Sequence, residues 1–305
     1  MEAKRASVAD GRRATGRPSV RTTVIELVRE LLPTPRRVRP DETLAELGLD
    51  SLAAADLAIG IEERLGVRLP DAEDLELETV RSVIEAVERG APVRHRIDPS
   101  LGTLLPMVTA VGGPAVRVYG RLRVEGARHV PPTGAVVIAS NHRSMLDIPV
   151  MVVATPRPVF FMAKRELYGD PVRDWVWRRL GGFPVRRQVA DLRAIDTALA
   201  LLERGDAVVV YPEGTRSRYG DMLPFLLGSA WLALKAGAPI VPCGVIGTGR
   251  QPGWNGRVAP WVGKHVRVRF GEPIAVERVD DARERRLRAE ALTTDLAPRV
   301  TELMA

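Results

Sequence analysis

The chain is poor in residues that hold metals and disulfides. Its 305 residues include one cysteine and four histidines, and aromatic residues make up 5% of the total. A single thiol excludes an internal disulfide framework and a cysteine-rich zinc site. Cys243 lies in an apolar run, where a buried and unreactive thiol is expected. We therefore predict no disulfide and assign no metal.

Long hydrophobic runs are also missing. The stretch Ser100–Val116 has seventeen uncharged residues and contains glycines and prolines that break helices. A membrane-spanning helix needs about 20 apolar residues, so this stretch is a poor candidate for one. A helix at a membrane interface and a helix that packs in the core both fit it. The first twenty residues lack the apolar core of a secretory signal, so we expect a cytoplasmic chain that contacts the inner face of a membrane peripherally.

Charge is distributed unevenly along the chain. From Pro40 to Gly90 there are fourteen acidic and four basic residues, a net charge of −10, whereas the whole chain carries +7 and the remainder therefore +17. An acidic body and a basic body attract each other. Together with the length, this asymmetry predicts two domains. We expect a disordered basic tail (1–20), a small helical domain (21–90), a linker (91–105) and a larger domain (106–305).

Strand and helix patterns alternate in the larger domain. Short apolar runs bounded by turns predict strands, and amphipathic stretches predict helices. Such alternation is typical of a mostly parallel sheet covered by helices. The expected strands are 121–125, 135–139, 159–162, 207–210, 240–245 and 266–270, and the expected helices follow Asp147 and span 192–203, 228–235 and 283–303.

A histidine and an aspartate follow one of these strands. The run Ala135–Ala139 is followed by Ser-Asn-His-Arg-Ser-Met-Leu-Asp, which places His142 and Asp147 five residues apart. Open α/β sheets bind ligands at the carboxyl ends of their strands. A turn that leads into a helix would bring Asp147 back toward the imidazole, where a carboxylate fixes the tautomer of the ring. Such a pair also arises by chance, so a purely structural role stays open at this point.

Three further segments extend this pattern. Gly181–Arg187 is a turn followed by two arginines, Glu-Gly-Thr-Arg-Ser occupies 213–217 after a strand, and Pro242 lies within a later strand. With the His-x4-Asp motif, residues from about 106 to 280 resemble the glycerolipid acyltransferase family, which includes the lysophosphatidic acid acyltransferases. The chain departs from the family in one place, because Phe-Leu-Leu-Gly stands at 225–228 where the family often has Phe-Lys-x-Gly.

The resemblance implies a mechanism and a set of site residues. His142 would take the proton of an acceptor hydroxyl as the hydroxyl attacks a thioester, and Asp147 would orient His142. Arg187 and Arg216 would bind the phosphate of the acceptor through forked hydrogen bonds. The other substrate-binding residues that the motif implies are Glu213, Gly214 and Thr215.

The small domain contains a second motif. Leu-Gly-Leu-Asp-Ser-Leu at 47–52 resembles the Asp-Ser-Leu signature of acyl carrier proteins, which implies a 4′-phosphopantetheine arm on Ser51. Asp50 and Ser51 also suit the start of a helix expected at 52–65. Helices expected at 22–32 and 80–87 complete a small bundle. An ordinary capped helix in an ordinary bundle is the alternative.

The two resemblances together predict an enzyme. The expected fold is an α/β acyltransferase domain preceded by a small all-α bundle like an acyl carrier. The expected reaction moves a fatty acyl chain from a phosphopantetheine thioester on Ser51 to a hydroxyl of a lysophospholipid such as 1-acylglycerol-3-phosphate. Its expected partners are a phosphopantetheinyl transferase and a membrane surface, and not a nucleic acid. Two alternatives remain: an acyl-coenzyme A-dependent enzyme with a degenerate carrier-like domain, and a non-catalytic carrier or scaffold protein with a vestigial acyltransferase body.

Overall fold

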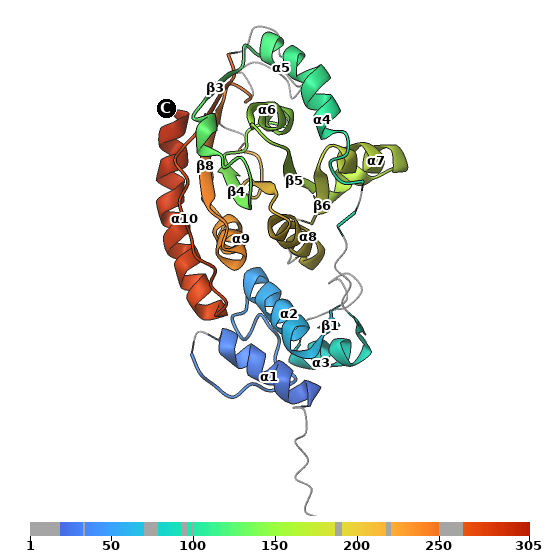
Figure 1. Cartoon of the computed structure of the whole chain (residues 1–305). Coiled ribbons are helices and arrows are strands. Elements are labelled where there is room, and N and C mark those ends of the chain that lie inside the picture. The colour runs from blue at the N-terminus through green and yellow to red at the C-terminus, as the bar shows by residue number, and fades with distance from the viewer. Residues whose placement is uncertain are drawn as a thin grey trace, which may run out of the picture.

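The fold has two parts, a small helical bundle and a larger α/β body (Figure 1). The computed structural model describes residues 19–32, 34–69, 79–92, 97–98, 100–186, 191–217, 221–249 and 265–305. Each part has its own cluster of buried apolar side chains. The expected combination of a helical bundle with an α/β body is confirmed.

A seven-stranded sheet forms the centre of the body within the described residues. Its strand order is β3-β9-β8-β4-β7-β5-β6, and neighbouring strands are parallel except for the antiparallel pair β8 and β9. The mostly parallel sheet expected from the sequence is therefore confirmed. The strands are β3 (Arg123–Glu125), β4 (Val136–Ser140), β5 (Val159–Lys164), β6 (Gly182–Val185), β7 (Ala207–Val210), β8 (Ile240–Ile246) and β9 (Arg267–Phe270).

Helices cover both faces of this sheet. Figure 1 shows α4, α5 and α6 on one face and α8 and α9 on the other, with α10 along one side. All four residues of β7 and all five of β4 are buried, because both strands have neighbours on each side and helices above and below. The helices of the body are α4 (Leu105–Met107), a π-helical turn (Val108–Gly112), α5 (Gly113–Tyr119), α6 (Asp147–Ala154), α7 (Pro171–Arg179), α8 (Leu192–Glu203), α9 (Gly228–Ala236) and α10 (Ala282–Met304).

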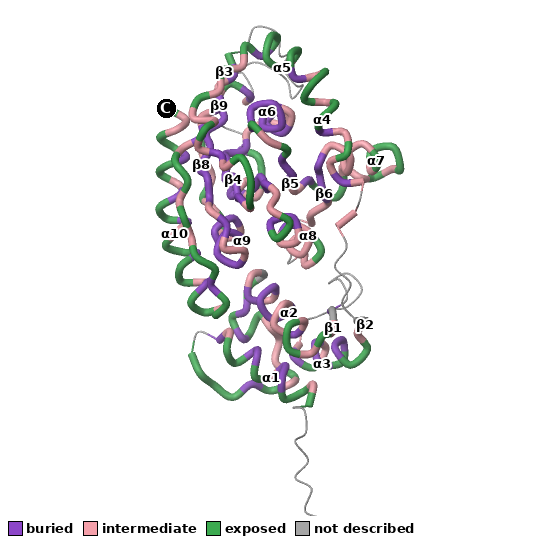
Figure 2. Tube along the Cα trace, viewed as in Figure 1, coloured by how far each residue is buried: buried purple, intermediate pink, exposed green. Residues whose placement is uncertain are grey.

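The helical bundle consists of α1 (Val20–Leu31), α2 (Ser51–Leu65) and α3 (Val80–Arg89). The opposite faces of α2 pack against different neighbours. Leu57 and Ile61 belong to the core of the bundle, whereas Ala55 is fully buried in the cluster of the body. Figure 2 shows this burial where α2 approaches α8 and α9. The carrier-like part is thus docked on the body through α2.

Three segments differ from the sequence expectations. β6 was expected as a turn, yet it forms an edge strand that contains Pro184, a position where a strand tolerates proline. The supposed linker begins with β2 (Ala91–Pro92), which pairs with β1 (Val67–Arg68) of the bundle. From Leu105 onward the uncharged stretch is helical without interruption, with a π-helical segment at Val108–Gly112, and it exposes Met107 and Val111, which argues against a core-packing helix.

Candidate active site

The site forms where two central strands end. β4 and β7 are parallel neighbours with Ala139 opposite Val210, so the loops after them lie side by side. The first loop carries His142 and the second carries Glu213. The backbone N–H of Ser217 donates to the carbonyl oxygen of His142 at 2.9 Å, which joins the loops directly.

His142 and Asp147 form a buried pair in this site. His142 Nδ1 lies 2.8 Å from Asp147 Oδ2, and the two side chains are 5% and 0% exposed. The same carboxylate oxygen accepts the backbone N–H groups of Arg143 at 2.7 Å and Ser144 at 2.8 Å, because the turn before α6 wraps around it. A carboxylate that accepts the Nδ1 proton leaves a lone pair on Nε2, the arrangement of a general base.

Glu213 holds the backbone of the His142 loop. Its Oε1 accepts the backbone N–H of His142 at 2.7 Å, and its Oε2 accepts that of Leu223 at 2.9 Å. The residue is 5% exposed, so neither oxygen faces bulk water. The sequence motif marks Glu213 but not this role, because Leu223 lies ten positions away without a recognisable pattern.

Two neighbours of His142, Tyr211 and Asn141, were not predicted from the sequence. Tyr211 stacks on the imidazole with ring centroids 4.1 Å apart and an angle of 21° between the planes. Burial, aided by the charge of Asp147, raises the pKa of Tyr211 well above its ordinary value, so the phenol stays neutral. Asn141 bonds both the N–H and the C=O of Val245, at 2.7 and 2.9 Å, and ties the loop to β8. An aromatic residue directly before Pro-Glu-Gly was the available signal for Tyr211.

The remaining motif residues follow Glu213 in the same loop, except Arg187. Thr215 and Arg216 are exposed in the loop after Glu213. Gly214 has φ +64° and lies so close to Leu226 that a β-carbon there would come within 2.8 Å of it. Arg187, the second expected phosphate ligand, lies outside the described residues. The geometry therefore brings Glu213, Gly214, Thr215 and Arg216 to the His142 loop.

Ser51 stands apart from this loop, as the first residue of α2. Asp50 caps the helix, because its carboxylate accepts the backbone N–H groups of Leu52 at 3.2 Å and Ala53 at 3.0 Å. Arg286 of α10 donates to the other oxygen of Asp50 at 2.8 Å. The structure thus places the expected attachment position where the bundle meets the body.

Three further findings concern metal sites, the single cysteine and membrane-spanning helices. Among the described residues no group of three or more His, Cys, Asp and Glu side chains is arranged to hold a metal ion. Cys243 is buried, and burial raises the pKa of its thiol far above the ordinary value, so it is the unreactive thiol expected from the sequence. None of the helices in the described ranges combines the length and the apolar character that crossing a membrane requires.

Two protein families match separate parts of the chain. Residues 121–246 match the family described as Acyltransferase, and these residues include the His142 loop and the Glu213 motif. Residues 22–87 match the family described as Phosphopantetheine attachment site, and they include Ser51. The two matched families, and their order along the chain, are those that the two resemblances implied.

Curated relatives and one solved structure show similarity to the same region. The chain is 39% identical over 129 residues to 1-acyl-sn-glycerol-3-phosphate acyltransferase alpha of Mus musculus and equally so to that of Homo sapiens, covering 41% of this chain and 45% and 46% of those proteins. It is also 31% identical to the chloroplastic 1-acyl-sn-glycerol-3-phosphate acyltransferase BAT2 of Brassica napus, and the aligned part covers 42% of this chain and 38% of that protein. It spans less than half the length of these relatives. The crystal structure of the LPA acyltransferase PlsC from Thermotoga maritima aligns with a TM-score of 0.45 and 26% identity, over 63% of this chain and 81% of that one.

Proposed function

We propose that this chain, in which an acyltransferase domain follows a carrier domain, transfers a fatty acyl group from a thioester to a hydroxyl of a lysophospholipid such as 1-acylglycerol-3-phosphate. The observation that carries the proposal is the buried His142–Asp147 pair inside the matched region. The names of the curated relatives support the acceptor class, since they are 1-acyl-sn-glycerol-3-phosphate acyltransferases.

The reaction needs one proton shuttle and no covalent enzyme intermediate. His142 Nε2 takes the proton of the acceptor hydroxyl while the oxygen attacks the thioester carbonyl. Asp147 holds the ring and stabilises the imidazolium that results. The carbon–sulfur bond then breaks, and the imidazolium returns its proton to the departing thiolate. The products are an ester and a free thiol, so His142 ends the cycle neutral.

The acceptor is held by its phosphate. Arg216 is exposed in the loop that Glu213 ties to the His142 loop, which supports a role for its guanidinium in binding the phosphate. We assign the same task to Arg187 and a role in binding acceptor hydroxyls to Thr215. Glu213 acts indirectly, as a positioning residue for the backbone of His142.

The donor distinguishes the proposal from its alternatives. We propose the thioester of a phosphopantetheine arm on Ser51, attached by a phosphopantetheinyl transferase. If acyl-coenzyme A is the donor, the carrier domain serves only for docking. If the body is vestigial, neither thioester is used.

The test is single-turnover transfer to 1-acylglycerol-3-phosphate by the full chain, with the acyl group supplied either on Ser51 or as acyl-coenzyme A. Intact mass first establishes that Ser51 gains the arm and that Ser51→Ala does not. Faster transfer from Ser51 supports the carrier donor. Faster transfer from coenzyme A selects the first alternative, and no ester from either donor selects the second.

We further propose that the body contacts membranes peripherally. Large apolar side chains are exposed on the 105–119 segment, including Val111 at 76% and Val118 at 72%, and Trp175 of α7 is 51% exposed. The guanidinium of Arg179 lies 4.7 Å from the centre of the Trp175 ring, so a cation and an aromatic face occur together, as at headgroup level.

Flotation with anionic vesicles tests this contact. Val111→Asp combined with Val118→Asp should reduce the bound fraction, whereas Thr294→Asp, which adds a charge to the exposed side of α10, should not. Equal flotation of all three proteins would contradict the assignment of this surface.

A further inference from the structure

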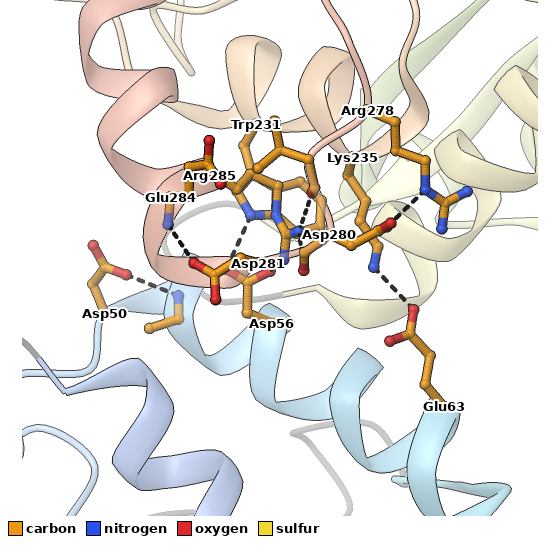
Figure 3. A network of polar contacts seen from close by, with 12 residues as sticks. Asp50, Asp56, Glu63, Trp231, Lys235, Arg278, Asp280, Asp281, Glu284 and Arg285 are labelled. Atoms are coloured by element: carbon orange, nitrogen blue, oxygen red, sulfur yellow. Dashed lines mark hydrogen bonds and ion pairs between the residues drawn. The ribbon is translucent and has the colours of Figure 1, made fainter.

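The bundle is held on the body by buried polar contacts (Figure 3). Asp56 of α2 pairs with Arg285 of α10, and the two side chains are 4% and 2% exposed. The indole N–H of Trp231 on α9 donates to Asp56 at 3.1 Å. Arg285 also donates to the carbonyl oxygens of Val279 at 2.5 Å and Asp280 at 3.0 Å. Charges are buried in this way only where each has several partners, so the contact defines one docked orientation.

A second ion pair gives the direction of α2. Lys235, one turn beyond Trp231 in α9, lies 2.9 Å from Glu63, which is farther along α2 than Asp56. From Asp56 to Glu63, the contacts of α2 therefore advance along α9 in the direction of the chain, from Trp231 to Lys235. Because α2 has fifteen residues, the opposite direction would have moved its first residue by about 22 Å.

This direction places Ser51 at the catalytic end of the body. α9 begins after the loop that carries Glu213 and ends before β8. The backbone N–H of Leu226, just before α9, donates to the carbonyl oxygen of Pro212 at 2.8 Å. Leu52 and Leu227 line one cleft, so the start of α2 lies beside the start of α9, at the edge of the sheet where β7 ends and its loop meets the His142 loop.

A cleft of about 250 Å³ opens beside the start of α2. Leu52, Leu227 and Leu287 contribute apolar wall, and Arg286 contributes a cation that lies 2.8 Å from Asp50. A phosphopantetheine arm matches this lining, because it begins with an anionic phosphodiester and continues as a chain with methyl and methylene groups. Asp50 would repel that phosphodiester if no cation lay between them.

We propose that α9 and the first turns of α10 form a seat for this chain's own carrier domain, in which Arg286 binds the phosphodiester on Ser51 and the adjacent cleft accepts the arm. The guanidinium has five N–H donors in a fork, so it can serve the phosphodiester and Asp50 together. The seat rests on the proposed function, since it requires that Ser51 carries the arm. It adds to that function the residue and the surface that recognise the loaded carrier.

The test uses the phosphorus of the arm. The full chain is loaded with coenzyme A and a phosphopantetheinyl transferase, and its ³¹P NMR signal is compared in the wild type, Arg286→Gln and Arg288→Gln. Arg288 is a matched control, because it lies two residues along α10 and pairs with exposed Glu284 at 2.6 Å. We expect the wild type and Arg288→Gln to have the same ³¹P chemical shift. In Arg286→Gln the chemical shift should move toward that of the urea-unfolded chain.

Hydrogen exchange gives a second measurement. Loading should slow the exchange of backbone amides at 52–56 in the wild type and in Arg288→Gln, and should slow it by roughly tenfold less in Arg286→Gln, the effect of losing a charge-assisted hydrogen bond. An unchanged ³¹P shift in Arg286→Gln, or faster exchange after loading the wild type, overturns the seat.

Neither measurement requires acyl transfer, so the seat and the catalytic proposal can fail separately. An intact mass that does not increase overturns both the seat and the carrier donor. A loaded chain that shows the expected ³¹P difference but forms no ester supports the seat and contradicts the catalytic proposal.

Discussion

At the scale of single residues, the proposed chemistry depends on the His142–Asp147 pair. His142→Ala should lower the rate of acyl transfer by about 10²–10⁴, the usual contribution of a general base. Asp147→Asn should impair transfer severely, because the amide cannot stabilise the imidazolium. Single-turnover rates measure both effects, and circular dichroism checks the fold. Near-normal turnover of His142→Ala would remove it from the mechanism.

Glu213 should affect both stability and catalysis. Glu213→Ala leaves the buried backbone N–H of His142 without its acceptor, at a cost of about 1–3 kcal/mol, and also removes the acceptor of the half-buried Leu223 N–H. Glu213→Gln keeps one carbonyl oxygen and should lose less stability. Urea unfolding measures the free energies, and kcat should fall more than KM rises if Glu213 positions His142. A change confined to KM would instead indicate direct acceptor binding.

The residues that the sequence could not reveal share one property. Motif spacing identified His142 and Asp147, because both partners belong to one short loop. The partners of Tyr211 and Asn141 lie 69 and 104 positions away, and only the pairing of strands brings them together. Local pattern therefore predicts the chemistry of this site, whereas the contacts that hold it depend on the sheet.

At the scale of elements, regular patterns predicted bounds well. α8 and β7 have the expected limits, because an amphipathic run after Asp191 and a fully buried strand are unambiguous signals. β6 was missed because Gly181, Gly182 and Pro184 are typical of a turn. An edge strand needs fewer ladder hydrogen bonds, so it accepts residues that a central strand excludes.

The capping of α2 should depend on pH through Asp50. Burial tends to raise the pKa of this carboxyl, but hydrogen bonds from the amides of Ala53 and Leu52 and the pairing with Arg286 outweigh it, so the pKa lies below its ordinary value of 3.8. Because the pKa is lowered, the charged carboxylate stabilises the fold above about pH 3.8. This contribution is lost as the pH falls through the lowered pKa of the folded state.

The comparison of wild type with Asp50→Asn isolates this effect. The wild type should be more stable above about pH 4, and the difference should vanish in stronger acid. Asp50→Ala should lose about 1 kcal/mol more at neutral pH, because it removes the cap itself. Urea unfolding across this pH range is the measurement. A difference between wild type and Asp50→Asn that persists in strong acid would show that charge is not its cause.

At the scale of the whole molecule, the charge asymmetry of the sequence corresponds to a specific interface. The acidic segment meets the basic body through Asp50, Asp56 and Glu63, which pair with cations of α9 and α10. Net charge predicts such an attraction but not its burial, because burial depends on which face of α2 turns outward. The buried position of Asp56 implies that this interface should resist salt more than an exposed one, since ions screen exposed charges most strongly.

The docked arrangement should therefore depend on Asp56 more than on any exposed ion pair. Asp56→Asn leaves Arg285 buried without its counter-charge, and breaking a buried pair in this way costs about 3–5 kcal/mol. Arg64→Gln is the control, because Arg64 and Glu30 form an exposed pair, with side chains 44% and 53% exposed, that contributes about 1 kcal/mol or less. Small-angle scattering of the full chain should show a larger radius of gyration for Asp56→Asn alone. The wild type should stay compact as salt is raised to about 1 M, where screening acts within about 3 Å. Expansion of the wild type in salt to the size of Asp56→Asn would mean that exposed charges, rather than the buried pair, hold the carrier domain on the body.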